Sequence, residues 1–478
     1  MMRMKRIVSV MLAAAMTAGL LAGCGSGSGQ KADSSKTAEN KAGGDGSGSG
    51  SAQAGGEGQT GEGQTGGDTQ NGEDKIELTF FYPIGVGGAL ATLIENLAVE
   101  FTKENPNIVL NPVFAGNSTE TMTKTVSALQ GGTPPDFAIL PNPELYSLLD
   151  MDAVIPLDDF IAADGGQEYI DDFMPAFLKN SYYDGKIYSI PFQRSTIIMY
   201  YNKDHFKEAG LDPEAPPANW EELRECAKKL TVTDASGNVS RWGVMIPMDD
   251  PFMFYGFSRQ NSATGTEIMS EDGKSVYFDT PENVEALQYL IDLAKVDKVM
   301  PEGAIKWGDG PSNFMAGATS ITFTSSGSLT NILDNTDFEV GTAFLPAGKQ
   351  YGSATGGANL YIFNGVDEKK QEAAWKFIRW ITEPERAAQW SIDTGYVATR
   401  KSSFDTDLMK DYLEKVPQAK TAKDQLDYAC SELRVHNNQR CLQALKQGVD
   451  AALTGASTPE EAMKQAQAEA QSLLESYQ

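Results

Sequence analysis

Residues 76–114 read IELTFFYPIGVGGALATLIENLAVEFTKENPNIVLNPVF, and this stretch decides the fold class. Its two ends, Ile76–Tyr82 and Ile108–Phe114, are rich in apolar and β-branched residues, which is typical of buried strands. Between them, apolar residues recur at helical spacing over Leu90–Phe101, and Asn105-Pro106 ends that pattern. A strand, a helix and a strand in this order predict a β-α-β unit, the seed of a parallel sheet.

The same alternation of extended and helical patterns continues toward the C-terminus. Extended segments are expected at 136–140, 188–201 and 318–324. Helices are expected at 121–129, 145–149, 203–210, 220–230 and 371–381, with amphipathic helices following to the end of the chain. Repeated alternation over about 400 residues predicts two α/β lobes.

The N-terminus predicts export and attachment to a membrane. Three basic residues precede the apolar run Ile7–Leu21, which is the layout of a secretory signal. The run closes with Leu21-Ala22-Gly23-Cys24, which resembles the bacterial lipoprotein box, where cleavage precedes a lipid-carrying cysteine. We therefore expect residues 1–24 to be a lipoprotein signal peptide and Cys24 to carry the lipid. The alternative is a plain signal peptide with a chance cysteine.

Residues 25–74 predict a disordered, Gly/Ser-rich tether. They contain no large apolar residue and cannot bury enough surface to offset the entropy of ordering. A flexible chain of this length spans on the order of 40 Å. A long tether resembles those of Gram-positive lipoproteins, so we expect the protein on the extracellular face of a Gram-positive cell membrane.

Charge and cysteine content exclude several classes of protein. The formal net charge of −26 lacks the basic footprint that nucleic-acid binding needs, so no nucleic-acid partner is expected. Beyond Cys24 the cysteines are Cys226, Cys430 and Cys441, an odd number that excludes a full disulfide framework. We expect buried thiols, and a bridge between Cys430 and Cys441 stays open if the chain turns between them.

Signals of catalysis and cofactor binding are missing from the sequence. Gly85-x-Gly87 is followed by Leu90 where a dinucleotide site needs a third glycine. The two histidines, His205 and His436, have no metal spacing, and no Gly-x-Ser-x-Gly or phosphate-loop motif occurs. We expect neither an enzyme, a cofactor nor a metal. A surface glycoside hydrolase stays a distant alternative, because it needs only two carboxylates about 5–9.5 Å apart.

Several short motifs run in order along the folded part. They are Phe114–Glu120, Ile190–Thr196, Tyr200–Asp204, Gly210–Pro213, Pro216–Leu223, Phe323–Ile332, Gly356–Ala358 and Thr394–Tyr396. Together they resemble the extracellular solute-binding proteins of ABC importers, family 1, in the group that binds sugars and glycerol 3-phosphate. The likeness is strongest to the members that bind glycerol 3-phosphate.

The resemblance implies a periplasmic-binding-protein-like α/β fold, with two lobes joined by a hinge and the ligand cleft between them. The chain would cross between the lobes near Ile190–Ser195, Phe344–Ala347 and Thr382–Glu385. Lobe 1 would hold 75–190 and 347–383, and lobe 2 would hold 192–345 and 384–478.

The function that the resemblance implies is capture of a small polar solute. A monomeric, lipid-anchored substrate-binding component would take up glycerol 3-phosphate or a related phosphorylated polyol or diester. It would deliver this ligand to the ABC permease subunits. The alternative ligand is a neutral mono- or oligosaccharide.

The resemblance also implies a set of ligand-binding residues. Arg440 would bind the phosphate as a bidentate fork. Ser195 and Ser325 would contact the ligand through their hydroxyls, Gly357 through its backbone and Tyr396 through its side chain. The residues alone leave an alternative for each position. These alternatives are a surface salt bridge for Arg440, solvated turn positions for Ser195 and Ser325, an ordinary Gly-Gly turn for Gly357 and a core aromatic for Tyr396.

Three positions depart from the family pattern. Ser118 stands where the glycerol-3-phosphate binders carry a tyrosine, and Asn142 where they carry a glutamate that binds the glycerol hydroxyls. Both are expected on lobe 1, so the polyol end of the ligand is expected to differ from glycerol. Arg194 replaces a small polar residue. It either adds a second positive charge to the ligand site or points to solvent.

The lipoprotein hypothesis predicts that Cys24→Ser releases the protein from membranes, because no later segment of the sequence is apolar enough to hold it there. The measurement is fractionation after a high-salt wash, with Cys226→Ser as the control. A mutant that stays with the membrane contradicts the hypothesis.

Overall fold

A β-α-β unit opens the part of the chain that the structure describes. The computed structural model describes residues 75–86, 89–265 and 268–478, so the signal peptide, Cys24 and the tether predicted at 1–74 lie outside it. The unit consists of β1 (Ile76–Tyr82), α1 (Leu90–Glu104) and β2 (Ile108–Phe114), which confirms the prediction. The two strands pair in parallel, with Ile76 opposite Ile108.

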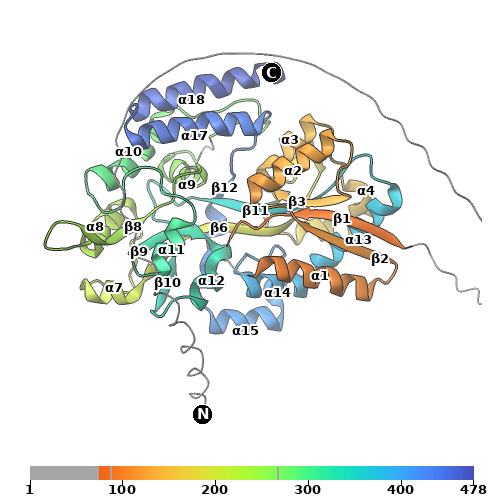
Figure 1. Ribbon diagram of the computed structural model, residues 1–478, viewed down its shortest axis with the longest axis horizontal. Coiled ribbons are helices and arrows are strands. Elements are labelled where there is room, and N and C mark those ends of the chain that lie inside the picture. Colours follow the sequence, from red (N-terminus) through yellow and green to blue (C-terminus); the bar gives the residue numbers. More distant parts are fainter. Residues whose placement is uncertain (1–74, 87–88, 266–267) are drawn as a thin grey trace, which may run out of the picture. The chain divides into compact units, whose positions relative to one another are not determined.

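One mixed sheet runs through the described residues in the order β2-β1-β3-β11-β6-β9-β8-β7 (Figure 1). Its centre is the antiparallel pair of β6 (Ile190–Asn202) and β11 (Ser353–Ile362). On the two sides of this pair lie β3 (Phe137–Pro141) and β9 (Thr319–Ser325). The remaining strands are β7 (Val232–Thr233), β8 (Val239–Met245), β10 (Val340–Ala343), β12 (Ala429–Cys430) and the hairpin of β4 (Tyr182–Tyr183) and β5 (Lys186–Ile187).

Two large apolar cores flank the central pair of strands. The first core lies around β1 and β3, where the rings of Phe80 and Phe137 stack with centroids 4.6 Å apart. The second core lies around β8 and β9 and includes Phe257, Phe323 and Leu290. Because each core is closed by its own helices, the described chain has two packed bodies joined through one sheet.

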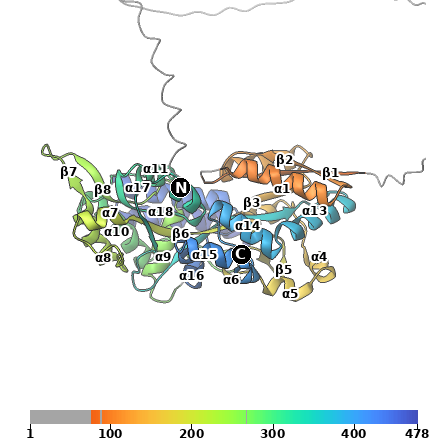
Figure 2. The same ribbon diagram turned by 90° about the horizontal axis from the view of Figure 1, so that it is seen from below.

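Helices are distributed between these cores, and Figures 1 and 2 show α1 and α13 against the strands β1 and β2. Around the first core lie α1, α2 (Ser118–Gln130), α3 (Leu145–Asp150), α4 (Asp158–Ala163), α5 (Gly166–Asp171), α13 (Glu368–Ile381) and α14 (Pro384–Thr394). Around the second core lie α7 (Lys203–Glu208), α8 (Trp220–Leu230), α9 (Phe252–Asn261), α10 (Pro281–Lys295), α17 (Asn438–Thr454) and α18 (Pro459–Leu474). The other α-helices are α6 (Pro175–Leu178), α11 (Asp309–Met315), α12 (Leu329–Asp334), α15 (Asp407–Lys415) and α16 (Ala419–Gln425).

The two central strands approach each other closely at Gly357. Its φ of +101° lies in the region that favours glycine, and a Cβ there would sit 1.8 Å from the carbonyl oxygen of Gln193. The register of the pair shifts just beyond it, between Ala358 and Asn359. The Gly-Gly sequence therefore lies inside a paired strand, just before a bulge, and is not a turn.

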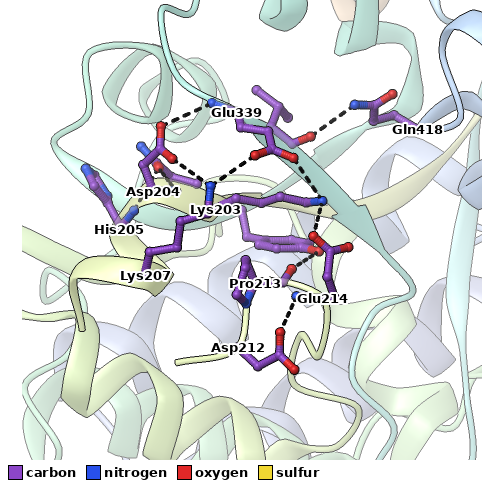
Figure 3. A network of polar contacts seen from close by, with 12 residues as sticks. Lys203, Asp204, His205, Lys207, Asp212, Pro213, Glu214, Glu339 and Gln418 are labelled. Atoms are coloured by element: carbon purple, nitrogen blue, oxygen red, sulfur yellow. Dashed lines mark hydrogen bonds and ion pairs between the residues drawn. The ribbon is translucent and has the colours of Figure 1, made fainter. Parts of the chain in front are cut away.

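The Tyr200–Asp204 motif ends β6 and begins α7. The Asn202 side chain accepts hydrogen bonds from two backbone N–H groups in the first turn of α7, which caps the helix. The Nζ of Lys203 lies 2.7 Å from Glu214 Oε1 and 3.2 Å from Glu339 Oε1 (Figure 3). Both acids are exposed, so these ion pairs contribute little to stability, and their effect is to hold the end of β6 beside the start of β10.

The cysteines of the folded part are buried and form no disulfide among the described residues. The expectation of buried thiols for Cys226, Cys430 and Cys441 is thus confirmed, and the possible bridge between the last two is absent. Burial raises the pKa of Cys441 to about 11, which keeps it as a thiol. No helix in the described ranges is long and apolar enough to cross a membrane.

We predict that Gly357→Ala destabilises the protein by about 3 kcal/mol, because the added methyl group overlaps the β6 backbone at a strained φ. The matched control is Gly365→Ala, which has a φ of +79° and open space around its Cβ position. It should cost only about 1 kcal/mol. Urea unfolding measures both changes, and equal losses would show that the close strand contact is unimportant.

Candidate functional site

Polar side chains gather where β3 ends, beside the central pair of strands. β3 runs directly into the 3-10 turn Asn142–Glu144, and β12, which pairs with β11, is followed within two residues by Glu432. Asp250 lies in the turn before α9. The pKa of Glu432 depends on Asp250, Arg194 and both ends of the 3-10 turn, so these groups lie within electrostatic reach of one another.

Asn142 is fully buried without an ordinary hydrogen bond. Its side chain is 0% exposed, and neither its nitrogen nor its oxygen has a partner at normal distance and angle. The amide nevertheless stabilises the ionised form of Glu432, so the two side chains face each other. A buried amide without a partner is costly. The arrangement therefore points to a partner from outside the chain.

Two carboxyl groups beside this amide titrate close to neutral pH. Burial raises the pKa of Glu432 to about 8; Asp250 and Glu144 raise it further, and Arg194 opposes the rise. Burial also raises the pKa of Glu144 to about 7, although Gln439 donates a hydrogen bond to it. Near pH 7 these groups can both donate and accept hydrogen bonds, because protonated and ionised forms coexist.

Asp250 lies close in sequence to an aromatic pair. Its side chain keeps contact with solvent, yet the surrounding protein raises its pKa by desolvation. Lys446, on α17, opposes this rise. Two residues after Asp250, the ring of Phe252 lies 5.7 Å from that of Trp307, and both side chains are only partly buried. Carboxyl groups, a cation and partly exposed ring faces thus lie near one another.

Arg194 is buried inside the sheet and does not point to solvent. Its Nη1 donates to Asn359 Oδ1 at 2.8 Å and to the carbonyl oxygen of Phe177 at 3.3 Å. Its Nη2 donates to Thr355 Oγ1 at 3.3 Å, and only Nε lacks a partner. Burial lowers its pKa to about 10, so it stays charged at neutral pH. The solvent-facing alternative is therefore wrong, and most of its donors bind the protein.

Four sequence-predicted residues lie around the central pair of strands. Ser195 in β6 pairs with β11 directly beside Gly357, and Ser325 ends β9. The Ser325 hydroxyl accepts a hydrogen bond from the backbone of Gly327. The Tyr396 ring packs over the same glycine, and its side chain is buried. The structure brings these four residues to one region, while their contacts with a ligand stay predictions.

Ser118 and Arg440 lie on the helices α2 and α17, outside the central strands. Ser118 is the first residue of α2, with its Oγ close to Gly85 in the loop after β1. Arg440 lies in the first turn of α17, exposed like Gln443 and Gln447 on the same helix face, and it forms no ion pair with a described residue. The phosphate-binding role of Arg440 stays a prediction, and this exposed position does not favour it.

Sequence reasoning missed several groups of the site. Glu144, Glu432, Asp250 and Lys446 carry no motif, and nothing in a single sequence marks them among 65 acidic and 39 basic residues. One signal in the sequence could have marked Asp250 as a site residue. It belongs to the acidic pair Asp249-Asp250, which comes shortly after the residues that form β8. That strand was not predicted, so the strand-end position of Asp250 went unrecognised.

Two hollows lie outside the central group. One, of about 1020 Å³, is lined by side chains from α3, the β4–β5 hairpin, residues 269–274 and Arg434. Its position beside Tyr146, two residues after Glu144, makes it a neighbour of the site. The other, of about 580 Å³, lies between α1 and α14 and contains none of the predicted site residues.

The comparisons with known proteins decide the family. The family of bacterial extracellular solute-binding proteins matches residues 96–418. The chain belongs to this family. The sn-glycerol-3-phosphate-binding periplasmic protein UgpB of Escherichia coli K12 is 28% identical over 410 residues, covering 82% of this chain and 91% of that protein. The family implies the substrate-binding component of an ABC importer, with a small-molecule ligand, permease partners and a periplasmic or extracellular location.

Solved structures confirm the fold class of this solute-binding protein. UgpB from Mycobacterium tuberculosis in complex with glycerophosphocholine superposes with a TM-score of 0.73 at 23% identity, covering 85% of this chain and all of that one. MalE from Bdellovibrio bacteriovorus bound to maltotriose superposes with a TM-score of 0.71 at 22% identity, covering 83% of this chain and 99% of that one. The predicted two-lobed α/β fold is therefore confirmed, while the lobe boundaries stay predictions.

Direct hydrogen bonds connect the two cores of this solute-binding protein at one edge of the site. The His436 ring nitrogen Nδ1 lies 2.7 Å from Asp150 Oδ1, and the backbone N–H of Asn437 donates to Asp150 Oδ2 at 3.1 Å. Tyr146 Oη donates to the carbonyl oxygen of Glu271 at 3.1 Å. Asp150 and Tyr146 belong to α3, whereas the other residues lie beside the second core, so we expect these bonds to hold the lobes closed.

Asp150→Asn should therefore raise the dissociation constant of the ligand roughly tenfold, because it removes a charged acceptor that stabilises closure. The loss should come from faster dissociation, measured by stopped-flow fluorescence. Asp152→Asn is the control, since Asp152 is bonded to Asn364 on the first-core side. Equal dissociation rates for the wild type and Asp150→Asn would contradict a role in closure.

Proposed function

We propose that this importer component captures an uncharged, hydroxyl-rich solute of the carbohydrate class. The observation that carries the proposal is the buried amide of Asn142, without an ordinary partner, opposite the carboxyl group of Glu432. Sugar hydroxyls both donate and accept hydrogen bonds, so they can satisfy an amide and a carboxylate together.

The charge balance of the site supports a neutral ligand over a phosphate. Glu432, Glu144 and Asp250 supply up to three negative charges, while Arg194 is the fully buried cation beside them. Most of the Arg194 donors are already bonded to the protein, so little is left for an anion. A phosphate would oppose the ionisation of these groups and would be repelled by each group that is ionised, and repulsion is strong where water is excluded.

The aromatic pair supports the same class of ligand. Sugar rings carry apolar C–H faces, and partly exposed aromatic rings provide flat surfaces on which such faces pack. Phe252 lies two residues after Asp250, its ring lies 5.7 Å from that of Trp307, and both side chains keep part of their surface accessible. A sugar placed there would have carboxyl groups within reach of its hydroxyls.

A phosphorylated polyol or its diester, the ligand class that the sequence predicted first, is the second candidate. The observation in its favour is the 28% identity to UgpB over 82% of the chain. Lys446 beside Asp250, together with Arg440 as the sequence predicted, would then supply the positive charge. The physical objection to it is repulsion between the phosphate and the three acidic groups. This repulsion is weaker for a diester, which carries one negative charge instead of up to two.

We also propose that the protein acts as a monomer attached through Cys24 to the outer face of a Gram-positive cell membrane. The support is the sequence alone, since the signal peptide, Cys24 and the tether lie outside the described residues. The relatives are solute-binding proteins and not enzymes, so a glycoside hydrolase has no support from them.

Calorimetry with a defined panel tests the ligand class. Maltotriose and mannobiose represent neutral sugars; glycerol 3-phosphate and glycerophosphocholine represent the second candidate. We expect a neutral sugar to bind, and at about a hundred times its dissociation constant to add roughly 2.7 kcal/mol of stability in a thermal shift assay.

Asn142→Ala should weaken that binding about tenfold or more, because the ligand loses a buried hydrogen-bonding partner. The matched control is Asn105→Ala, whose amide bonds the backbone at the end of α1, away from the site. Tight binding of glycerol 3-phosphate or glycerophosphocholine, with no binding of any neutral sugar, would overturn the proposal in favour of the second candidate.

A further inference from the structure

We propose that Glu432 is a ligand-binding residue, and that Glu432 and Asn142 together bind neighbouring hydroxyl groups of the ligand. The inference rests on the proposed function and names the group that determines its specificity. In this arrangement the carboxylate accepts hydrogen bonds from the hydroxyls and the amide completes the set from the opposite side.

The fold places the two groups on opposite sides of the site. Asn142 follows β3, whose strand packs in the first core, while Glu432 follows β12. The residues that flank Glu432, Cys430 and Leu433, are buried in the second core. Both strands pair directly with β11, so the central strand fixes their separation. A ligand held by both groups would connect the two cores.

Buried polar groups around Glu432 lack ordinary hydrogen bonds within the protein. Neither polar atom of Asn142 has an ordinary hydrogen bond, and the Nε of Arg194 has none either. Both side chains are fully buried. A folded protein rarely leaves such groups unsatisfied, and unpaired groups that converge on one point mark a place where a polar molecule belongs.

The charged surroundings of Glu432 define how it would respond to pH. The groups that face it are Asp250 before α9, Glu144 in the 3-10 turn and Arg194 in β6. Burial and the two acids favour its protonated form, so without ligand its pKa lies at about 8. Hydroxyl groups that donate to the carboxylate favour the ionised form instead. Ligand binding near pH 7 should therefore release a proton.

This linkage fixes the sign of the pH dependence. Below the pKa of the ligand-free protein, ionising Glu432 costs binding free energy, and above that pKa it costs nothing. Affinity should therefore rise as the pH increases from about 6 to about 8 and then level off, by up to tenfold for each unit of pKa change. If Glu432 only supported the fold, binding would not release a proton.

Isothermal calorimetry of the wild type in two buffers with different ionisation enthalpies measures the proton release directly. The probe is whichever of maltotriose and mannobiose binds more tightly. We expect release of about half a proton or more near pH 7. Glu432→Gln keeps the size of the side chain but cannot ionise. It should abolish the release and weaken binding about tenfold near pH 8, with a smaller loss near pH 6.

The matched control is Asp393→Asn on α14, another carboxyl group whose pKa burial raises, in the hollow between α1 and α14 and outside the site. It should leave affinity and proton release as in the wild type. Sugar binding without proton release, or with Glu432→Gln equal to the wild type, overturns this inference and leaves the proposed function standing. If neither sugar binds, the proposed function and this inference both fail.

Discussion

The close antiparallel pairing of β6 with β11 is the constraint on which the rest of the structure depends. At Gly357 the two backbones come too near for any side chain, so a glycine with positive φ is required there. Beyond this point β11 continues along β3, whereas β6 continues along β9. The same pair of strands thus belongs to both cores, and it fixes the position of one core relative to the other.

The pairing of β6 with β11 also determines the geometry of the candidate site. Asn142 and Glu432 follow strands that both bond to β11, and Arg194 lies within β6 opposite Gly357. The energetic cost of the arrangement is high, because it desolvates carboxyl groups beside a buried arginine whose donors are mostly occupied. Proteins retain such unfavourable clusters where a function requires them, since stability alone would favour apolar replacements.

The connection between ligand capture and delivery follows from the two-core architecture. A ligand bound between groups from the two cores favours the closed arrangement, in which hydrogen bonds act away from competing water. We expect the bonds from α3 to His436, Asn437 and Glu271, at one edge of the candidate site, to add to closure. Because they are few, closure would stay reversible, as release to a permease requires.

The sequence could predict the elements whose pattern is local. The β-α-β unit at 76–114 and the helices near 121–129, 220–230 and 371–381 were confirmed, because their apolar spacing reports burial directly. The strand β11 was missed, since Gly356-Gly357 suggests a turn to any local rule. Only its long-range pairing with β6 shows why a strand needs those glycines.

The sequence by itself determined the fold class, the buried thiols and, through short motifs, the family. The arrangement of Ser195, Ser325, Gly357 and Tyr396 around the central strands agrees with those motifs, because each lies within several matching neighbours. The tertiary structure alone decided that Arg194 is buried, that Arg440 is exposed and that Glu432 faces Asn142. The physical reason is that burial and the pairing of charges arise from contacts between residues hundreds of positions apart, and no local pattern records them.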